Sequence, residues 1–145
     1  MANLHDIVQW CNQTLKANEF KDYAPNGLQI EGKSEIKKIV CAVTASEDAI
    51  DAAIAQQADV LLVHHGYFWK GEPYPITGMR GNRIKKLIQH NISLIAYHLP
   101  LDAHPVLGNN AAIADLIGLK NLEALDSSEK HPIGNIAYLE HALSP

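Results

Sequence analysis

The 145-residue chain has few cysteines and no long apolar run, and its N-terminus shows no basic region followed by an apolar stretch. Cys11 and Cys41 lie far apart and form no CxxC pair, so we expect two buried free thiols rather than a disulfide. No apolar segment is long enough to span a bilayer, and no signal peptide is visible. We therefore expect a cytoplasmic protein with no membrane partner.

An excess of positive charge is also absent. The formal net charge of -4 gives no general attraction to nucleic acid or to anionic membranes, so a nucleic-acid partner is not expected. The chain holds no internal repeat and no low-complexity segment. It also lacks the GxxxxGK[ST] loop that cradles phosphates. The possibility that the chain binds nucleotides in some other way stays open.

The composition is typical of a soluble globular protein, with 47% apolar and 19% charged residues. Its length fits a single domain with one core, here residues 1–145. Apolar runs predict strands near 36–43, 59–63 and 92–97, and helical patterns separate them. This alternation favours an α/β fold, a three-layer sandwich in which helices flank a largely parallel sheet.

Further elements follow from spacing and from capping residues. Residues 22–30 hold a Pro-Asn-Gly turn and a short apolar stretch, which form either a surface connection or a loop over a site. Capping rules place the helix ends. The expected elements are a helix from Leu4 capped by Asn3, a helix after a Thr44-x-x-Glu47 capping box, a helix over 79–88, a short helix over 111–117 capped by Asn109 or Asn110, and a last strand near 136–139.

Two adjacent histidines end the second predicted strand, in a chain that has eight histidines in all. A regular strand would direct His64 and His65 to opposite faces of the sheet. Both reach one site only if the chain turns after them, and Gly66 permits such a turn. Imidazole is the commonest metal ligand among side chains. The alternative, a histidine pair that caps the strand by bonding backbone carbonyls, stays open.

A second polar group, His98 and Asp102, follows the third predicted strand. Pro100 disfavours the helical conformation for the residue before it, so we expect a loop here. If the two strands are neighbours, all four side chains converge at one edge of the sheet. Imidazoles and a carboxylate suit Zn, Mn, Fe, Co or Ni, and a carboxylate can bridge two ions. The alternatives are a turn-forming role for Asp102 and a core or outer-sphere role for His98.

Two further clusters of side chains have two interpretations each. The aromatic cluster, Tyr67, Phe68 and Trp69, either stacks on a substrate ring or forms an apolar patch in a subunit contact, and we favour the contact. The basic cluster forms either a solvated helix face or, less favoured, a phosphate site. It consists of Arg80, Arg83, Lys85 and Lys86.

Four motifs in consistent order resemble the Nif-three-like family, the YbgI-type proteins that often carry the label GTP cyclohydrolase I type 2 homologue. The resemblance covers nearly the whole chain. It implies the Nif-three-like α/β fold, a dinuclear metal centre, a ring-like homo-oligomer and a hydrolase whose substrate is unsettled. The motifs are Asp22-Tyr23-Ala24-Pro25-Asn26-Gly27-Leu28-Gln29, Val43-Thr44-Ala45-Ser46, Val63-His64-His65-Gly66-Tyr67-Phe68-Trp69-Lys70-Gly71 and His98-Leu99-Pro100-Leu101-Asp102-Ala103-His104-Pro105 with Gly108-Asn109-Asn110.

Carried over by motif, His64, His65 and Asp102 match family metal ligands, and His98 lies beside the centre as the candidate catalytic residue. The family completes its centre with a His and a Glu four residues apart, late in a much longer chain. These 145 residues offer no such pair, so the chain resembles the N-terminal part of the family.

The resemblance favours a metal-dependent hydrolase that uses divalent metal ions and metal-activated water, with His98 as a proton carrier or an outer-sphere group. The competing hypothesis is a non-catalytic metal-binding or interaction protein that oligomerises through its aromatic surface. The GTP in the family label has no support from the residues, and the substrate is an unknown small molecule.

Overall fold

The computed structural model describes residues 1–139 and 141. The chain divides into two compact units, Met1–His98 and Leu99–Pro145. The single domain expected over residues 1–145 stays a prediction.

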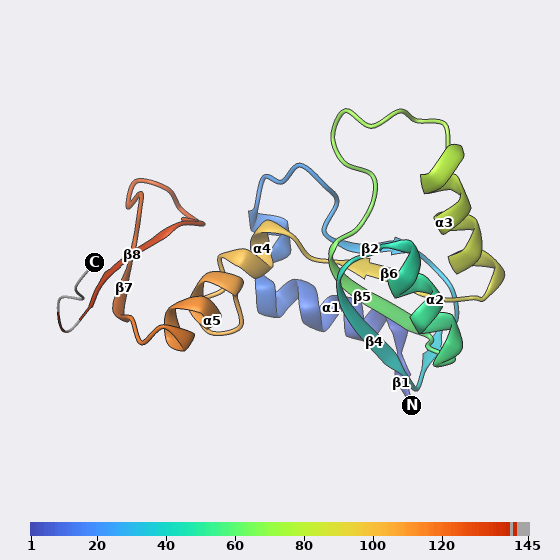
Figure 1. The fold of residues 1–145 in the computed structure, drawn as a ribbon, viewed down its shortest axis with the longest axis horizontal. Coiled ribbons are helices and arrows are strands. Elements are labelled where there is room, and N and C mark those ends of the chain that lie inside the picture. Colours follow the sequence, from blue (N-terminus) through green and yellow to red (C-terminus); the bar gives the residue numbers. More distant parts are fainter. Residues whose placement is uncertain (140, 142–145) are drawn as a thin grey trace. The chain divides into compact units, whose positions relative to one another are not determined.

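A four-stranded sheet in the order β2-β6-β5-β4 forms the centre of the first unit (Figure 1). Strands β4 (Ile39–Thr44), β5 (Val60–His65) and β6 (Ser93–Ala96) are parallel, as predicted. Strand β2 (Gly27–Ile30) was not predicted and pairs with β6 in the antiparallel direction. Gly27, the last residue of the predicted Pro-Asn-Gly turn, begins it at a φ of +104°, a conformation that L side chains rarely adopt.

Helices cover both faces of this sheet, which confirms the three-layer α/β fold. Helix α1 (Leu4–Leu15) lies on one face, and α2 (Glu47–Ala55) and α3 (Gly78–Gln89) lie on the other (Figure 1). Burying one large aliphatic side chain contributes about 1.5–3 kcal/mol, so the core between the sheet, α2 and α3 is the main stabilising term. That core includes Ile50, Ala53, Leu61, Val63, Ile84, Leu87, Leu94 and Ala96.

Shorter elements complete the first unit. Strands β1 (Ala2–Asn3) and β3 (Glu35–Ile36) form a small antiparallel sheet, and a 3-10 turn, η1 (Ala17–Glu19), follows α1. Asn3 caps α1 as predicted, because its side chain accepts a hydrogen bond from the His5 amide.

Helix α1 is tied to the end of β6 by Tyr97. Its hydroxyl lies 2.9 Å from Oδ1 of Asn12 and 3.2 Å from the carbonyl oxygen of Val8. Only 2% of Tyr97 is exposed, and this burial raises the pKa of its hydroxyl above the usual value. The hydroxyl therefore stays protonated and can donate at neutral pH.

The predicted capping box of α2 is wrong. Strand β4 continues to Thr44, which pairs with His65 across the sheet, so the helix starts later. Ser46 is the cap, and its Oγ accepts a hydrogen bond of 3.2 Å from the Ala49 amide. The extra strand pairing moves the cap by two residues and leaves the Thr44 hydroxyl for another partner.

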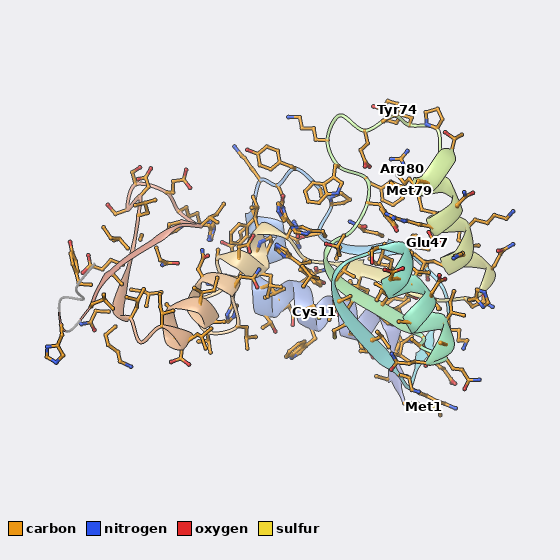
Figure 2. The ribbon with its side chains drawn as sticks, in the orientation of Figure 1. Met1, Cys11, Glu47, Tyr74, Met79 and Arg80 are labelled. Atoms are coloured by element: carbon orange, nitrogen blue, oxygen red, sulfur yellow. The ribbon has the colours of Figure 1, made fainter. Side chains whose placement is uncertain are left out.

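Of the predicted basic cluster on α3, Lys85 is exposed as expected for a solvated face, whereas Arg80, Arg83 and Lys86 form ion pairs. Arg80 donates to Oε2 of Glu72 at 2.8 Å and to the carbonyl oxygen of Pro75 at 2.9 Å, and its side chain lies between α3 and the preceding loop (Figure 2). Arg83 and Lys86 pair with Glu47 of α2. These contacts fix the two helices and the loop to each other.

In its described residues, 99–139 and 141, the second unit contains two helices and a hairpin. Strand β8 (Asn135–Tyr138) confirms the predicted last strand and pairs in the antiparallel direction with β7 (Lys120–Ala124), which was not predicted. Helix α5 (Asn109–Leu116) begins after Gly108, and no side chain caps it. The two asparagines that were expected to cap it instead donate to other groups of the unit, Asn109 to Asp102 and Asn110 to the carbonyl oxygen of Ile133.

The loop expected around Pro100 is instead a short helix, α4 (Leu99–Asp102). A proline is tolerated in the first turn of a helix, where its missing N–H would have no partner within the helix. The disfavoured helical conformation of Leu99, before Pro100, is adopted here all the same, so the loop prediction is wrong.

The two cysteines are free thiols, but only one is buried. Cys11 lies inside, whereas Cys41 is exposed on β4. The prediction of two buried cysteines fails at Cys41 because this face of β4 is uncovered in the described part of the chain, where Ile39 is 41% and Val43 70% exposed. Among the described helices, none combines the length and the apolar character needed to cross a membrane.

Asp59 joins the start of β5 to the segment before β4. It is 7% exposed, and its Oδ2 accepts from the amides of Lys37 at 2.9 Å and Lys38 at 3.1 Å. Its Oδ1 lies 2.9 Å from Nζ of Lys33. Burial alone would raise the pKa of Asp59, but these hydrogen bonds and the Lys33 charge together hold it below its ordinary value.

We predict that Asp59→Ala lowers the free energy of unfolding by about 1–3 kcal/mol, because two partly buried backbone amides lose their acceptor. The pKa of Asp59 is lowered on folding, so its contribution is present above about pH 4, the unfolded value, and is lost as the pH falls further. Urea denaturation at pH 7 and pH 3 measures both effects. The control Asp48→Ala removes an exposed carboxylate and should change stability by less than about 0.5 kcal/mol. Equal losses for the two variants at pH 7 would contradict this role.

Candidate metal centre

Three histidines come together at the carboxyl end of the central sheet. His64 and His65 are the last residues of β5, and His98 follows β6. One ring nitrogen from each lies within 4.8 Å of the others. The ring centroids are 4.4 Å apart for His64 and His65, 5.1 Å for His64 and His98, and 5.7 Å for His65 and His98. This spacing allows one ion to contact all three imidazoles.

The chain turns directly after His65, and the turn depends on close approach at Gly66. A Cβ on Gly66 would lie 2.2 Å from Oε1 of Gln29 and 2.8 Å from the Ala96 Cβ, so only glycine fits. Within the segment that follows, Phe68 adopts a left-handed conformation, at a φ of 66°. Such a conformation in a non-glycine residue costs on the order of 1–3 kcal/mol and is often found at functional sites.

Each imidazole has its Nδ1 engaged by a group outside the cluster. Nδ1 of His64 lies 2.9 Å from the carbonyl oxygen of Tyr97, and a carbonyl only accepts, so this nitrogen carries the proton. Nδ1 of His65 lies 3.1 Å from the Thr44 hydroxyl, and Nδ1 of His98 lies 2.7 Å from Oδ1 of Asp22. Metal-binding histidines are held in this way in proteins, with the second ring nitrogen as the ligand. The donor set therefore fits a divalent transition metal.

The segment over residues 22–29 leans over the site, which decides between the two alternatives left open by the sequence. Asp22 contacts the His98 ring, and Oδ1 of Asn26 accepts from the His98 amide at 2.7 Å. Oε1 of Gln29 accepts from the Tyr67 amide at 2.7 Å. Sequence reasoning missed these three residues as part of the site. The available signal was the polar Gln29 between two apolar residues of a short strand.

The aromatic residues after Gly66 have different roles. Tyr67 is 7% exposed, and its hydroxyl donates to the carbonyl oxygen of Ala45 at 2.6 Å. Burial raises the pKa of Tyr67 to about 12, so it remains a donor at neutral pH. Trp69 lies edge-on to the His98 ring, with centroids 4.9 Å apart, and forms a wall of the cluster.

Hydrogen bonds to the following loop, which is itself held by Arg80 of α3, fix the position of Trp69. Its amide donates to Oε2 of Glu72 at 3.0 Å, and the same oxygen accepts from Arg80. Its indole N–H donates to the carbonyl oxygen of Gly66 at 3.2 Å. An otherwise irregular loop therefore holds the aromatic wall in one place.

A cavity of about 570 Å³ lies beside this arrangement and shares Asp22 with it. Aromatic rings and one cation contribute to its lining, together with the Asp22 carboxylate. The rings and the cation belong to Phe20, Tyr23, Phe68 and Lys70.

Asp102, the predicted carboxylate ligand, belongs to the second unit. It ends α4, and Nδ2 of Asn109 donates to its Oδ1 at 2.7 Å. Its part in the site stays a prediction. His104 in the same unit has a structural role, because its Nδ1 lies 3.2 Å and 3.0 Å from the amides of Val106 and Leu107.

Comparison with known proteins identifies relatives over most of the chain. A relative from Neisseria meningitidis serogroup B, named GTP cyclohydrolase 1 type 2 homolog, is 58% identical over 118 residues, which are 81% of this chain and 47% of the relative. A relative of the same name from Haemophilus influenzae is 56% identical over 126 residues, which are 87% of this chain and 50% of the relative. The chain thus spans about half the length of the curated relatives it matches.

Solved structures give the same result. The protein ybgI, described as of unknown function, matches with a TM-score of 0.81 and 49% identity over 84% of this chain and 49% of its own. TTHA1606 from Thermus thermophilus matches with a TM-score of 0.80 and 41% identity over 86% of this chain and 51% of its own. A family model described as Duf34/NIF3 (NGG1p interacting factor 3) matches residues 2–144. The resemblance seen in the motifs is confirmed, and the chain belongs to the DUF34/NIF3 family.

Proposed function

We propose that this chain binds a divalent metal ion at His64 and His65 and takes part in metal-dependent hydrolysis. The observation that carries the proposal is the cluster of three imidazoles, each with its Nδ1 held from outside. Asp102 is proposed as the third protein ligand, on the strength of the family motif. Zn, Mn, Fe, Co and Ni all suit such a set.

When bound, the ion would supply Lewis acidity and activate water for attack on a substrate. His98 is proposed as the proton carrier at this site. Its Nδ1 lies against the buried carboxylate of Asp22, whose side chain is 2% exposed, and this contact orients the ring. The cavity beside the cluster offers space for the substrate. The name shared by the relatives mentions GTP, but nothing in this chain's residues selects that substrate.

We propose at most one tightly bound ion per chain. A metal with three protein ligands keeps an open coordination position, which is enough for one ion. A second ion would need donors of its own at fixed positions, and the cluster found among the described residues offers three imidazoles only. One ion should therefore bind, whereas the second ion of a dinuclear centre should bind only weakly.

We predict that calorimetric titration with Zn²⁺ or Mn²⁺ finds at most one tight site per chain. The double variant His64→Ala, His65→Ala should lose more than about 100-fold in affinity, beyond the 10–100-fold loss typical of outer-sphere changes. It should stay folded, because both side chains are half-buried at a strand end. The control His90→Ala removes an exposed histidine after α3 and should bind like the parent. Two tight sites per chain, or a double variant that binds normally, would show that the centre is misplaced.

A non-catalytic metal-binding or interaction protein is the competing hypothesis. It requires metal ligands but no proton carrier, so under this hypothesis His98 only completes or supports the imidazole cluster. We propose a cytoplasmic location for either case.

We also propose that the protein forms a homo-oligomer. In the described part of the chain, β4 has β5 as its neighbour in the sheet and presents Ile39 and Val43 to solvent. Exposed apolar edge strands are usually covered in native proteins. Of the three aromatic residues that were expected at a contact, Tyr67 is buried within the first unit, so Phe68 and Trp69 stay as candidates.

We predict that sedimentation at micromolar concentration shows an oligomer and that Val43→Lys shifts it toward the monomer, because a charge would be buried at the contact. The control Tyr74→Lys changes a fully exposed residue at the tip of the loop before α3 (Figure 2) and should leave the assembly intact. A monomeric parent under these conditions would refute the proposal.

A further inference from the structure

Asp22 occupies an unusual place for a carboxylate, since its side chain is 2% exposed and lies against the ring of His98. Its Oδ1 lies 2.7 Å from Nδ1 of His98 and 2.6 Å from the amide of Tyr23. Its Oδ2 lies 2.9 Å from Nδ2 of Asn26. Both oxygens of this buried carboxylate therefore have hydrogen-bonding partners.

The orientation of the Asn26 amide is set by a group that can only donate. The His98 backbone amide donates to Oδ1 of Asn26 at 2.7 Å. The other end of the Asn26 side chain is therefore the NH₂ group, and it donates to Oδ2 of Asp22. No choice of amide flip is left at this position.

The Asp22 carboxylate consequently accepts hydrogen bonds on both oxygens. The Tyr23 amide can only donate to Oδ1, and Asn26 donates to Oδ2. A carboxylate in this arrangement acts as an acceptor, so the hydrogen between Oδ1 and the His98 ring belongs to Nδ1 of the ring. The neutral ring then carries its lone pair on Nε2.

We infer that Asp22 is a positioning residue that holds His98 in the Nδ1–H tautomer, with Asn26 fixing both the carboxylate and the His98 backbone. This inference rests on the proposed metal site for its functional meaning. In that site, His98 can accept a proton, or bind an ion, only through Nε2. Without Asp22 the ring would be free to rotate or to take the other tautomer.

The substitution Asp22→Leu tests the inference, because leucine is similar in size to aspartate and offers no acceptor. Without a carboxylate oxygen, no group at this position accepts a hydrogen bond from Nδ1–H of His98. The Asn26 and Tyr23 donors lose the same acceptor. Tyr23→Ala is the matched control in the same segment, since it leaves the backbone amide in place.

The measurement is ¹⁵N NMR of the histidine side chains in metal-free protein, with His98 assigned by the loss of its signals in His98→Gln. We expect the Nδ1–H tautomer of His98 in the parent and in Tyr23→Ala, and its loss in Asp22→Leu. An Nε2–H tautomer in the parent, or an unchanged tautomer in a folded Asp22→Leu, would overturn the inference. The result for the parent requires no variant to fold.

The same samples separate this inference from the proposed function. Zinc titration of the parent tests the metal site, whereas the tautomer is read without metal. A parent that shows the Nδ1–H tautomer but binds no zinc would refute the proposed function and leave the positioning role of Asp22 standing.

Discussion

The parallel pairing of β5 with β6 is the constraint on which the site depends. Val60 pairs with Ser93 and Val63 with Ala96, so both strands end at the same edge of the sheet. An antiparallel pairing would send their polar ends to opposite edges. The parallel arrangement in turn requires the crossover through α3, whose buried face covers the strands. The core packing of the sheet therefore decides where the imidazoles meet.

The sheet brings the histidines together, but segments distant in sequence orient them. Thr44 at the end of β4 contacts His65, and Asp22 and Asn26 hold His98. Gln29 supports the backbone after Gly66. Since each ring is held through Nδ1, contacts within the protein fix the orientation of all three rings.

Much of the fold and part of the site could be predicted because their signals are local. Apolar runs and turn residues gave the three parallel strands, and the change from apolar residues to histidines marked the end of β5. The failures are non-local. Strand β2 is short and depends on pairing with β6. The predicted capping box did not form because Thr44 pairs with His65 in the sheet. Asp22 lies 76 positions from His98, and no spacing rule connects them.

We propose that His64 and His65 bind a divalent metal through their Nε2 atoms. Anomalous diffraction from crystals of the protein grown with zinc would locate the ion. We expect a zinc peak about 2.0–2.1 Å from Nε2 of both residues, with their Nδ1 contacts to Tyr97 and Thr44 kept. Zinc bound only at other histidines, or coordinated through Nδ1 of His64 with the Tyr97 contact broken, would contradict it.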